Sequence, residues 1–304
     1  MHRSLRLCLP LLVALGGAGC AFRLPAPAVA FASAPAPAAA PADPSLLALT
    51  QDHALIRVRA SAPDLVLSRV AVKGLAAGDS LVGLDFRVAR GVLYTLAASG
   101  QLYTLAPDTG VLTPVGRAAA ALGPAGTRWG FDFNPAADRI RVVGSQGRNL
   151  RLHPDTGAPV DGNPAEPGLQ DDAPLRYAEG DAHQGWVPQV AAAAYSYHQK
   201  DDKLTTNYAI DTGLGLLVRQ GSLEGVQPVV SPNTGLLFTV GPLGLRGPLE
   251  DAALDVADVH NQALAALRSA GVTRLYRVDL ASGRAQALGR LADGAPLRGL
   301  AIEP

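Results

Sequence analysis

The sequence predicts an all-β fold, a β-propeller of four-stranded antiparallel blades. Three observations support this prediction: the composition, a repeat of about fifty residues, and a C-terminal strand that supplies what the first repeat lacks. The chain of 304 residues is 48% apolar and 17% charged, with 33 glycines and 24 prolines. This profile is typical of short strands joined by tight turns.

The N-terminus has the form of a bacterial export signal. Arg3 and Arg6 give it a basic start, and the apolar run over residues 7–18 is too short to cross a bilayer as a permanent helix. The run ends at Cys20 in a Gly-Ala-Gly-Cys sequence that resembles the lipobox of bacterial lipoproteins. We expect a signal peptide over residues 1–20 and lipidation of Cys20. The alternative is ordinary cleavage after Ala30, which would give a soluble secreted or periplasmic protein.

Residues 21–44 are dominated by Ala and Pro, a composition that forms an extended tether rather than a core. Residues 45–304 are therefore expected to form a single propeller domain. The only cysteines are Cys8 and Cys20, so this domain has neither a disulfide nor a thiolate metal site. We expect a monomer at the cell envelope that meets the membrane only through its lipid anchor.

Charge excludes one class of partner. The 26 basic and 26 acidic side chains cancel and are spread along the chain, so there is no positive field to attract phosphates. Nucleic acid is therefore not an expected partner.

The repeat begins with a strand that carries a Gly-x-Asp motif. Residues 82–87 read VGLDFR and recur as WGFDFN at 129–134, and more loosely at 252–257 and 298–302. Apolar stretches that follow the first two copies predict second and third strands, at 92–96 and 101–105 and at 139–143 and 149–152.

A turn closes the third strand. Its sequence is Pro-Asp-Thr-Gly at 107–110 and 154–157, in which Asp accepts backbone N–H bonds and Gly supplies positive φ. Looser echoes occur at 211–213, 233–235 and 281–283. Fourth strands ending in Gly are predicted at 112–116 and 286–289. The recurrence of Asp-Thr-Gly as a turn argues against the aspartic-protease tripeptide that it resembles.

The two chain ends predict how the ring closes. Residues 46–50, 53–58 and 66–72 match strands two, three and four, with no first strand before them. The missing strand is at 298–302, and its joining to the N-terminal blade would remove exposed sheet edges. This count gives five blades. Six is the alternative, because residues 189–250 show the repeat poorly.

Two segments depart from the repeat. Residues 161–189 are longer than a blade turn needs and rich in Pro, Gly and acidic residues, so we expect a loop over one face of the disc. Residues 249–270 have the propensity of a helix, but the Leu-Asp-Val match at 254–256 lies where a blade should begin, and two strands are predicted instead.

Together these motifs resemble the bacterial family called domain of unknown function 4394. The resemblance is carried by the Gly-Leu-Asp-Phe and Gly-Phe-Asp-Phe-Asn-Pro strand starts, the stretch at 149–157, the strand at 192–195 and the terminal stretch at 296–302. It covers residues 46–302. It implies a propeller-like exported protein and brings no known activity with it.

Asp85, Asp132 and Asp255 hold the same place in the first strands of three blades. Because first strands line the axis of a propeller, the three carboxylates are expected to approach one another there. One reading is a structural clamp, in which each buried Asp accepts backbone or hydroxyl hydrogen bonds. The other is a site for a ligand or a divalent cation such as calcium, which prefers several oxygen ligands.

His183 and Trp186, in the acidic insert, are the remaining candidate ligand-binding residues. No histidine has the spacing of a local metal motif, so a solvated loop histidine is the competing interpretation of His183.

The sequence identifies no reaction and no catalytic residue. The favoured hypothesis is an envelope propeller, not an enzyme, that binds a small molecule, glycan or protein through one disc face. The alternative is a metal-dependent hydrolase of the lactonase kind with a cation in the channel. A structural envelope protein without a ligand is the third possibility.

Overall fold

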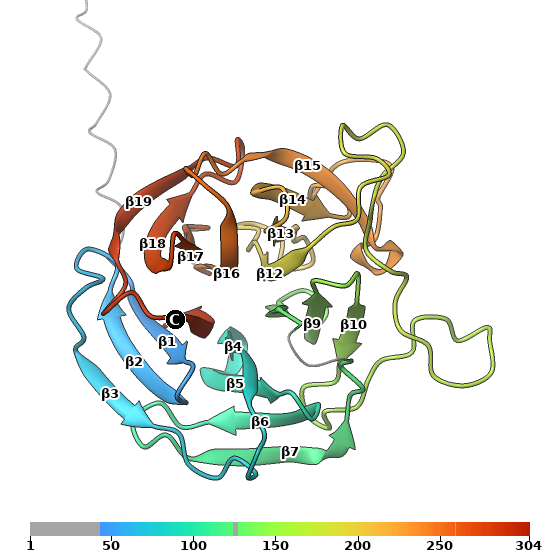
Figure 1. The fold of residues 1–304 in the computed structure, drawn as a ribbon. Coiled ribbons are helices and arrows are strands. Elements are labelled where there is room, and N and C mark those ends of the chain that lie inside the picture. Colours follow the sequence, from blue (N-terminus) through green and yellow to red (C-terminus); the bar gives the residue numbers. More distant parts are fainter. Residues whose placement is uncertain (1–42, 124–126, 259) are drawn as a thin grey trace, which may run out of the picture. The chain divides into compact units, whose positions relative to one another are not determined.

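A computed structural model describes residues 43–123, 127–258 and 260–304, which belong to one compact unit, Ala42–Pro304. These residues form five sheets, the blades, around a common axis (Figure 1); all their strand pairs are antiparallel except β11 with β15. The described part of the chain contains no α-helix. The predicted signal peptide with Cys20, and the tether up to residue 42, lie outside the described residues.

Each blade runs from an inner strand at the axis to an outer strand at the rim (Figure 1). Blade 1 consists of β20 (Leu297–Ile302), β1 (Ser45–Thr50), β2 (Ala54–Arg59) and β3 (Ser68–Ala71). Blade 2 consists of β4 (Leu81–Arg87), β5 (Val92–Ala97), β6 (Gln101–Leu105) and β7 (Leu112–Ala119). Blade 3 consists of β8 (Trp129–Asn134), β9 (Arg139–Gly144) and β10 (Asn149–Leu152).

Blade 4 has an extra strand and consists of β12 (Val190–Tyr195), β13 (Asn207–Asp211), β14 (Leu216–Gln220), β15 (Leu236–Pro242) and β11 (Arg176–Tyr177). Blade 5 consists of β16 (Leu249–Val256), β17 (Ala263–Ser269), β18 (Val272–Val278) and β19 (Ala285–Arg290). Two short 3-10 helices complete the fold, η1 (Val88–Arg90) and η2 (Pro232–Thr234).

The predicted five-bladed architecture is confirmed, and so is the ring closure. Strand β20 pairs antiparallel with β1, with Leu46 opposite Ile302 and Ala48 opposite Leu300. Residues 189–250, which left six blades open, form blade 4. Residues 249–270 form β16 and β17 rather than a helix, as predicted.

Two expectations are corrected. The insert at 161–189 was expected over a disc face, but its strand β11 pairs with β15 at the rim of blade 4. The physical reason is that the rim offers an unpaired strand edge, whereas a disc face offers no backbone partners. The Asp-Thr-Gly turn at 211–213 joins a second strand to a third, β13 to β14, instead of following a third strand.

The five inner strands, β4, β8, β12, β16 and β20, form the hub. They approach closely because small residues face the neighbouring strand: a Cβ on Gly83 would lie 2.4 Å from the Cβ of Phe131, and one on Gly130 would lie 2.5 Å from the backbone nitrogen of Ala193. The space that remains at this level is about 20 Å³, roughly the room of one water molecule. The hub is therefore a packed core at this level, not an open channel.

Candidate functional site at the hub

Asp85, Asp132 and Asp255 meet at the hub, as their equivalent places in the repeat predicted. One carboxylate oxygen from each lies within 4.8 Å of the others, and all three residues are buried. We call them the aspartate cluster. Their convergence follows from the repeat, because each comes from an inner strand at the same level of the axis.

Two members of the aspartate cluster join blades 2, 3 and 4. The Asp85 carboxylate accepts a hydrogen bond from the backbone N–H of Phe86 (2.7 Å) and another from that of Phe133 in the next blade (2.8 Å). The Asp132 carboxylate accepts one from the backbone N–H of Tyr195 in blade 4 (2.8 Å). Each aspartate thus ties its own inner strand to the following one.

Asp255 joins blade 5 to blade 1 in the same way. Its carboxylate accepts hydrogen bonds from the backbone N–H groups of Val256 and Ile302, both at 2.6 Å. The three carboxyl groups therefore accept five backbone N–H groups among them, and these bonds run round the hub. This is the pattern that the clamp interpretation requires.

Burial raises the pKa values of the aspartate cluster. The pKa values of Asp85 and Asp132 lie well above the ordinary value, and that of Asp255 is raised to about 6. The neighbouring carboxylates add to this effect at Asp85 and Asp132. The cluster therefore retains protons at a pH where an exposed aspartate is ionised.

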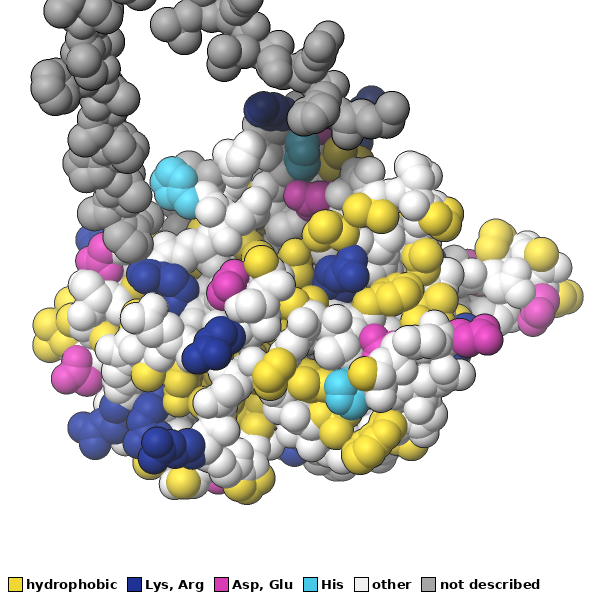
Figure 2. All heavy atoms as spheres, turned by 90° about the horizontal axis from the view of Figure 1, so that it is seen from above, with side chains coloured by type: hydrophobic (Ala, Val, Ile, Leu, Met, Phe, Trp, Pro, Cys, Tyr) yellow, Lys and Arg dark blue, Asp and Glu magenta, His cyan; other side chains and the backbone are white. Residues whose placement is uncertain are grey.

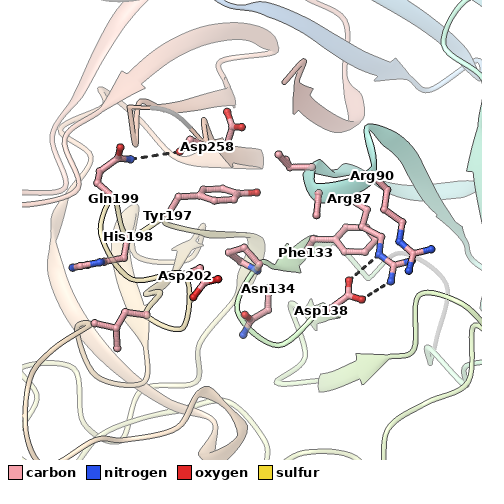
Figure 3. A pocket seen from close by; sticks show the side chains of 14 residues that line it. Arg87, Arg90, Phe133, Asn134, Asp138, Tyr197, His198, Gln199, Asp202 and Asp258 are labelled. Atoms are coloured by element: carbon pink, nitrogen blue, oxygen red, sulfur yellow. Dashed lines mark hydrogen bonds and ion pairs between the residues drawn. The ribbon is translucent and has the colours of Figure 1, made fainter.

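A pocket of about 640 Å³ lies where the inner strands end (Figure 3). Four blades contribute to it, through the segments that follow β4, β8, β12 and β16. We call it the hub pocket. It is lined by Arg87, Val88, Ala89, Arg90, Phe133, Asn134, Pro135, Asp138, Tyr197, His198, Gln199, Asp202, Leu204 and Asp258.

Tyr197 connects the hub pocket to the aspartate cluster. Its backbone is fixed by Asn261, whose side-chain amide donates to the Tyr197 carbonyl and whose Oδ1 accepts from the Tyr197 N–H, both at 2.6 Å. Its phenol points toward the middle of the pocket (Figure 3). Burial raises the pKa of Tyr197 well above its ordinary value, and nearby acidic groups act in the same direction. The phenol therefore remains protonated.

The two arginines of the hub pocket are engaged at its edge. The Arg87 guanidinium forms ion pairs with Asp138 and Asp155, the latter at 2.6 Å. Hydrogen bonding to Arg87 lowers the pKa of Asp155, and the charge of Arg90 lowers it further. Both guanidinium groups lie beside Asp138, away from the Tyr197 hydroxyl (Figure 3).

His183 and Trp186 do not join the hub. The Nδ1 atom of His183 lies 2.9 Å from the Thr239 hydroxyl on β15, and its ring contacts those of Tyr177 and Trp186, with centroids 5.4 and 6.4 Å apart. Trp186 is 60% exposed. These residues lie with the insert on the rim of blade 4. The predicted candidate residues therefore occupy two separate places: the three aspartates at the hub, and His183 and Trp186 at the rim.

Sequence reasoning missed most of the hub pocket. Arg87 and Phe133 had a signal, because each follows an Asp of the repeated motif by one or two residues. Residues 197–204 had none, because they belong to the region without a visible repeat, and only the ring brings them over the axis.

The exposed surface shows no single-sign field on the edge seen in Figure 2, where basic, acidic and apolar side chains are interspersed. This agrees with the balanced charge of the sequence. In the described ranges, no helix has the length and apolar character needed to cross a membrane.

Comparison with known proteins yields a family and distant structural likenesses. A family model described as "Domain of unknown function (DUF4394)" matches residues 54–301. No curated protein matches the sequence.

Among solved structures, a nidogen/laminin complex chain is 11% identical (TM-score 0.47), with 86% of this chain and 98% of that chain covered. An auxiliary nutrient binding protein from Bacteroides ovatus is 12% identical (TM-score 0.45; 80% and 53% covered). A dihydro-heme d1 dehydrogenase is 14% identical (TM-score 0.37; 88% and 47% covered). The chain spans about half the length of the last two.

Proposed function

The chain belongs to the DUF4394 family, and we propose that it is a ligand-binding propeller that holds a small polar molecule in the hub pocket. The observation that carries this proposal is the pocket itself. It has a volume of about 640 Å³, within the range of small-molecule sites, and segments from four blades converge on it.

The lining supports a polar ligand of modest size. Tyr197 offers ring surface, while Asn134, Gln199 and Asp202 offer hydrogen-bonding groups. A few polar groups set in a concave, partly apolar surface are the usual means by which a protein orients a small molecule. The packed hub below the pocket keeps the ligand on this side of the disc.

The test is a ligand screen with a blocked pocket. Ala89 is exposed on η1 and lines the pocket, so Ala89→Trp is expected to fill it without disturbing the hub. A panel of polar metabolites is screened for an increase in the thermal midpoint, which any ligand of the folded state produces. Ala77→Trp, in the loop that leads to the start of β4, is the matched control. Increases that Ala89→Trp abolishes and Ala77→Trp retains support the proposal, and increases that survive in both variants contradict it.

We propose further that the protein is exported and anchored at the envelope through Cys20. This rests on the basic start, the short apolar run and the Gly-Ala-Gly-Cys sequence. Metabolic labelling with a palmitate analogue is expected to mark the wild type and not Cys20→Ala. An unlabelled wild-type protein, cut after Ala30, would show ordinary secretion instead.

A metal-dependent hydrolase is the second candidate, favoured by the three carboxylate oxygens within 4.8 Å of one another. A divalent cation on the aspartate cluster would polarise a carbonyl and orient water. Lactone turnover that is lost in Asp85→Asn and Asp132→Asn, with folding intact, would support it. The absence of any shift in the thermal midpoint between EDTA and added calcium, magnesium, manganese or zinc would leave the aspartates as clamps.

A further inference from the structure

We propose that the hub pocket takes an organic cation, with its ammonium head beside the Tyr197 phenol and the carboxylates of Asp202 and Asp258. The inference deepens the proposed function and rests on it, because it names the chemical class of the ligand. It is carried by the pocket geometry, the orientation of the charged side chains and the aromatic surface at the centre.

The cationic side chains of the pocket lie at its edge and not at its centre. Arg87 is committed to Asp138 and Asp155 through ion pairs, and Arg90 acts on Asp155 from the same edge. In Figure 3 both guanidinium groups are turned away from the Tyr197 hydroxyl. Among the described residues that line the pocket, these are the only two arginines, and there is no lysine. The centre of the pocket therefore lacks a positive group from the protein.

Carboxylates of the lining surround that centre. Asp202 and Asp258 line the pocket together with the Tyr197 phenol (Figure 3). Burial and nearby carboxylates, Asp258 among them, raise the pKa of Tyr197. A ligand with a positive head would balance the charge of these two carboxylates.

The remaining titratable groups of the lining add no positive charge at the centre of the pocket. Asp202 and Asp258 are acidic, and Asp138 is already paired with Arg87. The Nδ1 atom of His198 accepts the backbone N–H groups of Lys200 (3.3 Å) and Asp201 (2.9 Å). An accepting Nδ1 belongs to a neutral imidazole, so His198 contributes no positive charge in this arrangement.

The size and the aromatic surface of the pocket favour an organic cation over a metal ion. Tyr197 presents its aromatic ring to a pocket of about 640 Å³ (Figure 3). A metal ion prefers oxygen ligands and needs far less room. An alkylammonium group is attracted to the faces of aromatic rings and fills apolar volume at the same time.

The experiment compares cations with uncharged molecules of the same shape. Purified protein is titrated by calorimetry with choline and its carbon analogue 3,3-dimethylbutan-1-ol, and with putrescine and 1,4-butanediol. In at least one pair the cation is expected to bind the protein about tenfold more tightly than its uncharged analogue does. Asp258→Asn is expected to weaken that binding about fivefold, while Asp64→Asn, an exposed aspartate in the β2–β3 loop, leaves it unchanged.

The outcomes separate this inference from the function on which it depends. If the uncharged member of each pair binds as well as the cation, and Ala89→Trp abolishes that binding, the pocket is a ligand site but the inference is wrong. If cations bind equally well to wild type and Ala89→Trp, the inference is wrong because they bind elsewhere. If neither these probes nor the metabolite panel bind in a way that Ala89→Trp abolishes, both proposals fail.

Discussion

At the scale of single residues, the three aspartates of the hub accept different numbers of backbone N–H groups. Asp85 and Asp255 each accept two backbone N–H groups, whereas Asp132 accepts one. The oxygen of an amide group can still accept a single N–H. An amide cannot replace a carboxyl group whose two oxygens each accept an N–H without turning its NH₂ toward one of them.

This inequality predicts different outcomes for isosteric substitutions. Asp132→Asn is expected to keep the free energy of unfolding at pH 7 close to that of wild type, because its remaining oxygen can still accept the Tyr195 N–H. Asp255→Asn is expected to lower it by about 1–3 kcal/mol, because one of two buried N–H groups loses its acceptor. Urea unfolding of the two variants checks this. Equal losses in both would show that the number of accepted N–H groups does not decide the cost.

The raised pKa values predict how stability depends on pH. The folded pKa of Asp255, about 6, lies above the ordinary value of 3.8, so between these values the folded protein keeps a proton that the unfolded chain has released. Stability is therefore complete below about pH 4 and falls as the pH rises through 6, by on the order of 3 kcal/mol for this group.

Asp85 and Asp132 act in the same direction at higher pH, because their pKa values are also raised. Unfolding measured at pH 5 and pH 8 is expected to show the lower stability at pH 8, with a smaller difference in Asp132→Asn. A wild-type protein that gains stability toward pH 8 would contradict the protonated cluster, and would agree instead with a cation at the hub.

At the scale of the strand, the Gly-x-Asp motif has two separate causes. The Asp binds the next blade, and the Gly two positions earlier lets the neighbouring inner strand approach. Ala192 and Ala253 occupy the corresponding place in the blades without this Gly, so the position is small in all five. The repeat visible in the sequence therefore reflects the close approach of the inner strands at the hub.

Gly130→Ala tests this close approach. Its added Cβ would lie 2.5 Å from the Ala193 nitrogen, and since its φ is not positive the cost is steric rather than conformational. We expect a loss of about 1–3 kcal/mol in the free energy of unfolding. Gly213→Ala is the control, because its Cβ would meet only the flexible Gln189 side chain, at 3.1 Å. Similar stabilities for the two variants would mean that the inner strands can move apart.

The insert acts as a strap between blades 3 and 4. The buried Asp172 carboxylate is held by Arg141 of β9 and by Arg151 of β10 (2.7 Å), while β11 pairs with β15 of the next blade. Arg141 is itself buried, so it depends on this carboxylate for its charge balance. A segment that the sequence marks as irregular is in this way fixed by two ion pairs and a short strand.

Asp172→Ala is expected to destabilise the protein by about 3–5 kcal/mol, because it leaves the buried Arg141 without its anion. Its neighbour supplies the control. Asp171 pairs with Arg148 at the surface, and Asp171→Ala is expected to cost less than about 1 kcal/mol. Thermal or urea unfolding of both variants checks the contrast, and equal effects would show that the strap does not bear on stability.

At the scale of the whole molecule, the ring is closed by the last strand of the chain. Strand β20 completes blade 1, the Ile302 N–H donates to Asp255 of blade 5, and Glu303 forms an ion pair with Arg57 at 2.8 Å. A chain lacking residues 297–304 would leave the inner edge of β1 unpaired, with β2 as its only partner, and the hub open. We expect it to lose its cooperative unfolding transition, as followed by circular dichroism in urea.

Glu303→Gln is the control for this truncation, because it removes only the partly exposed ion pair with Arg57 and keeps the strand. It is expected to unfold cooperatively, with a loss of about 1 kcal/mol or less. A truncated chain that unfolds like the wild type would mean that the ring does not need its closing strand.

Much of the fold could be predicted from the sequence because the blade is a repeated unit. Local turn chemistry and alternating apolar residues marked most strands of blades 1, 2, 3 and 5, and the missing first strand pointed to β20. Blade 4 showed the repeat poorly because its inner strand, VAAAAY, is apolar on both faces and lacks both the Gly and the Asp of the motif. Strand β20 keeps the Gly and β16 keeps the Asp, so the repeat signal was lost only where both residues are absent.

The sequence by itself determined the architecture and the convergence of Asp85, Asp132 and Asp255, because equivalent positions of a repeat must occupy equivalent places round an axis. Only the tertiary structure decided the rest: the backbone N–H groups that the aspartates accept from the next blade, the strap at the rim, and the pocket formed over the axis by residues from η1 to Asp258. Those features depend on contacts between segments up to about two hundred residues apart, which no local pattern encodes.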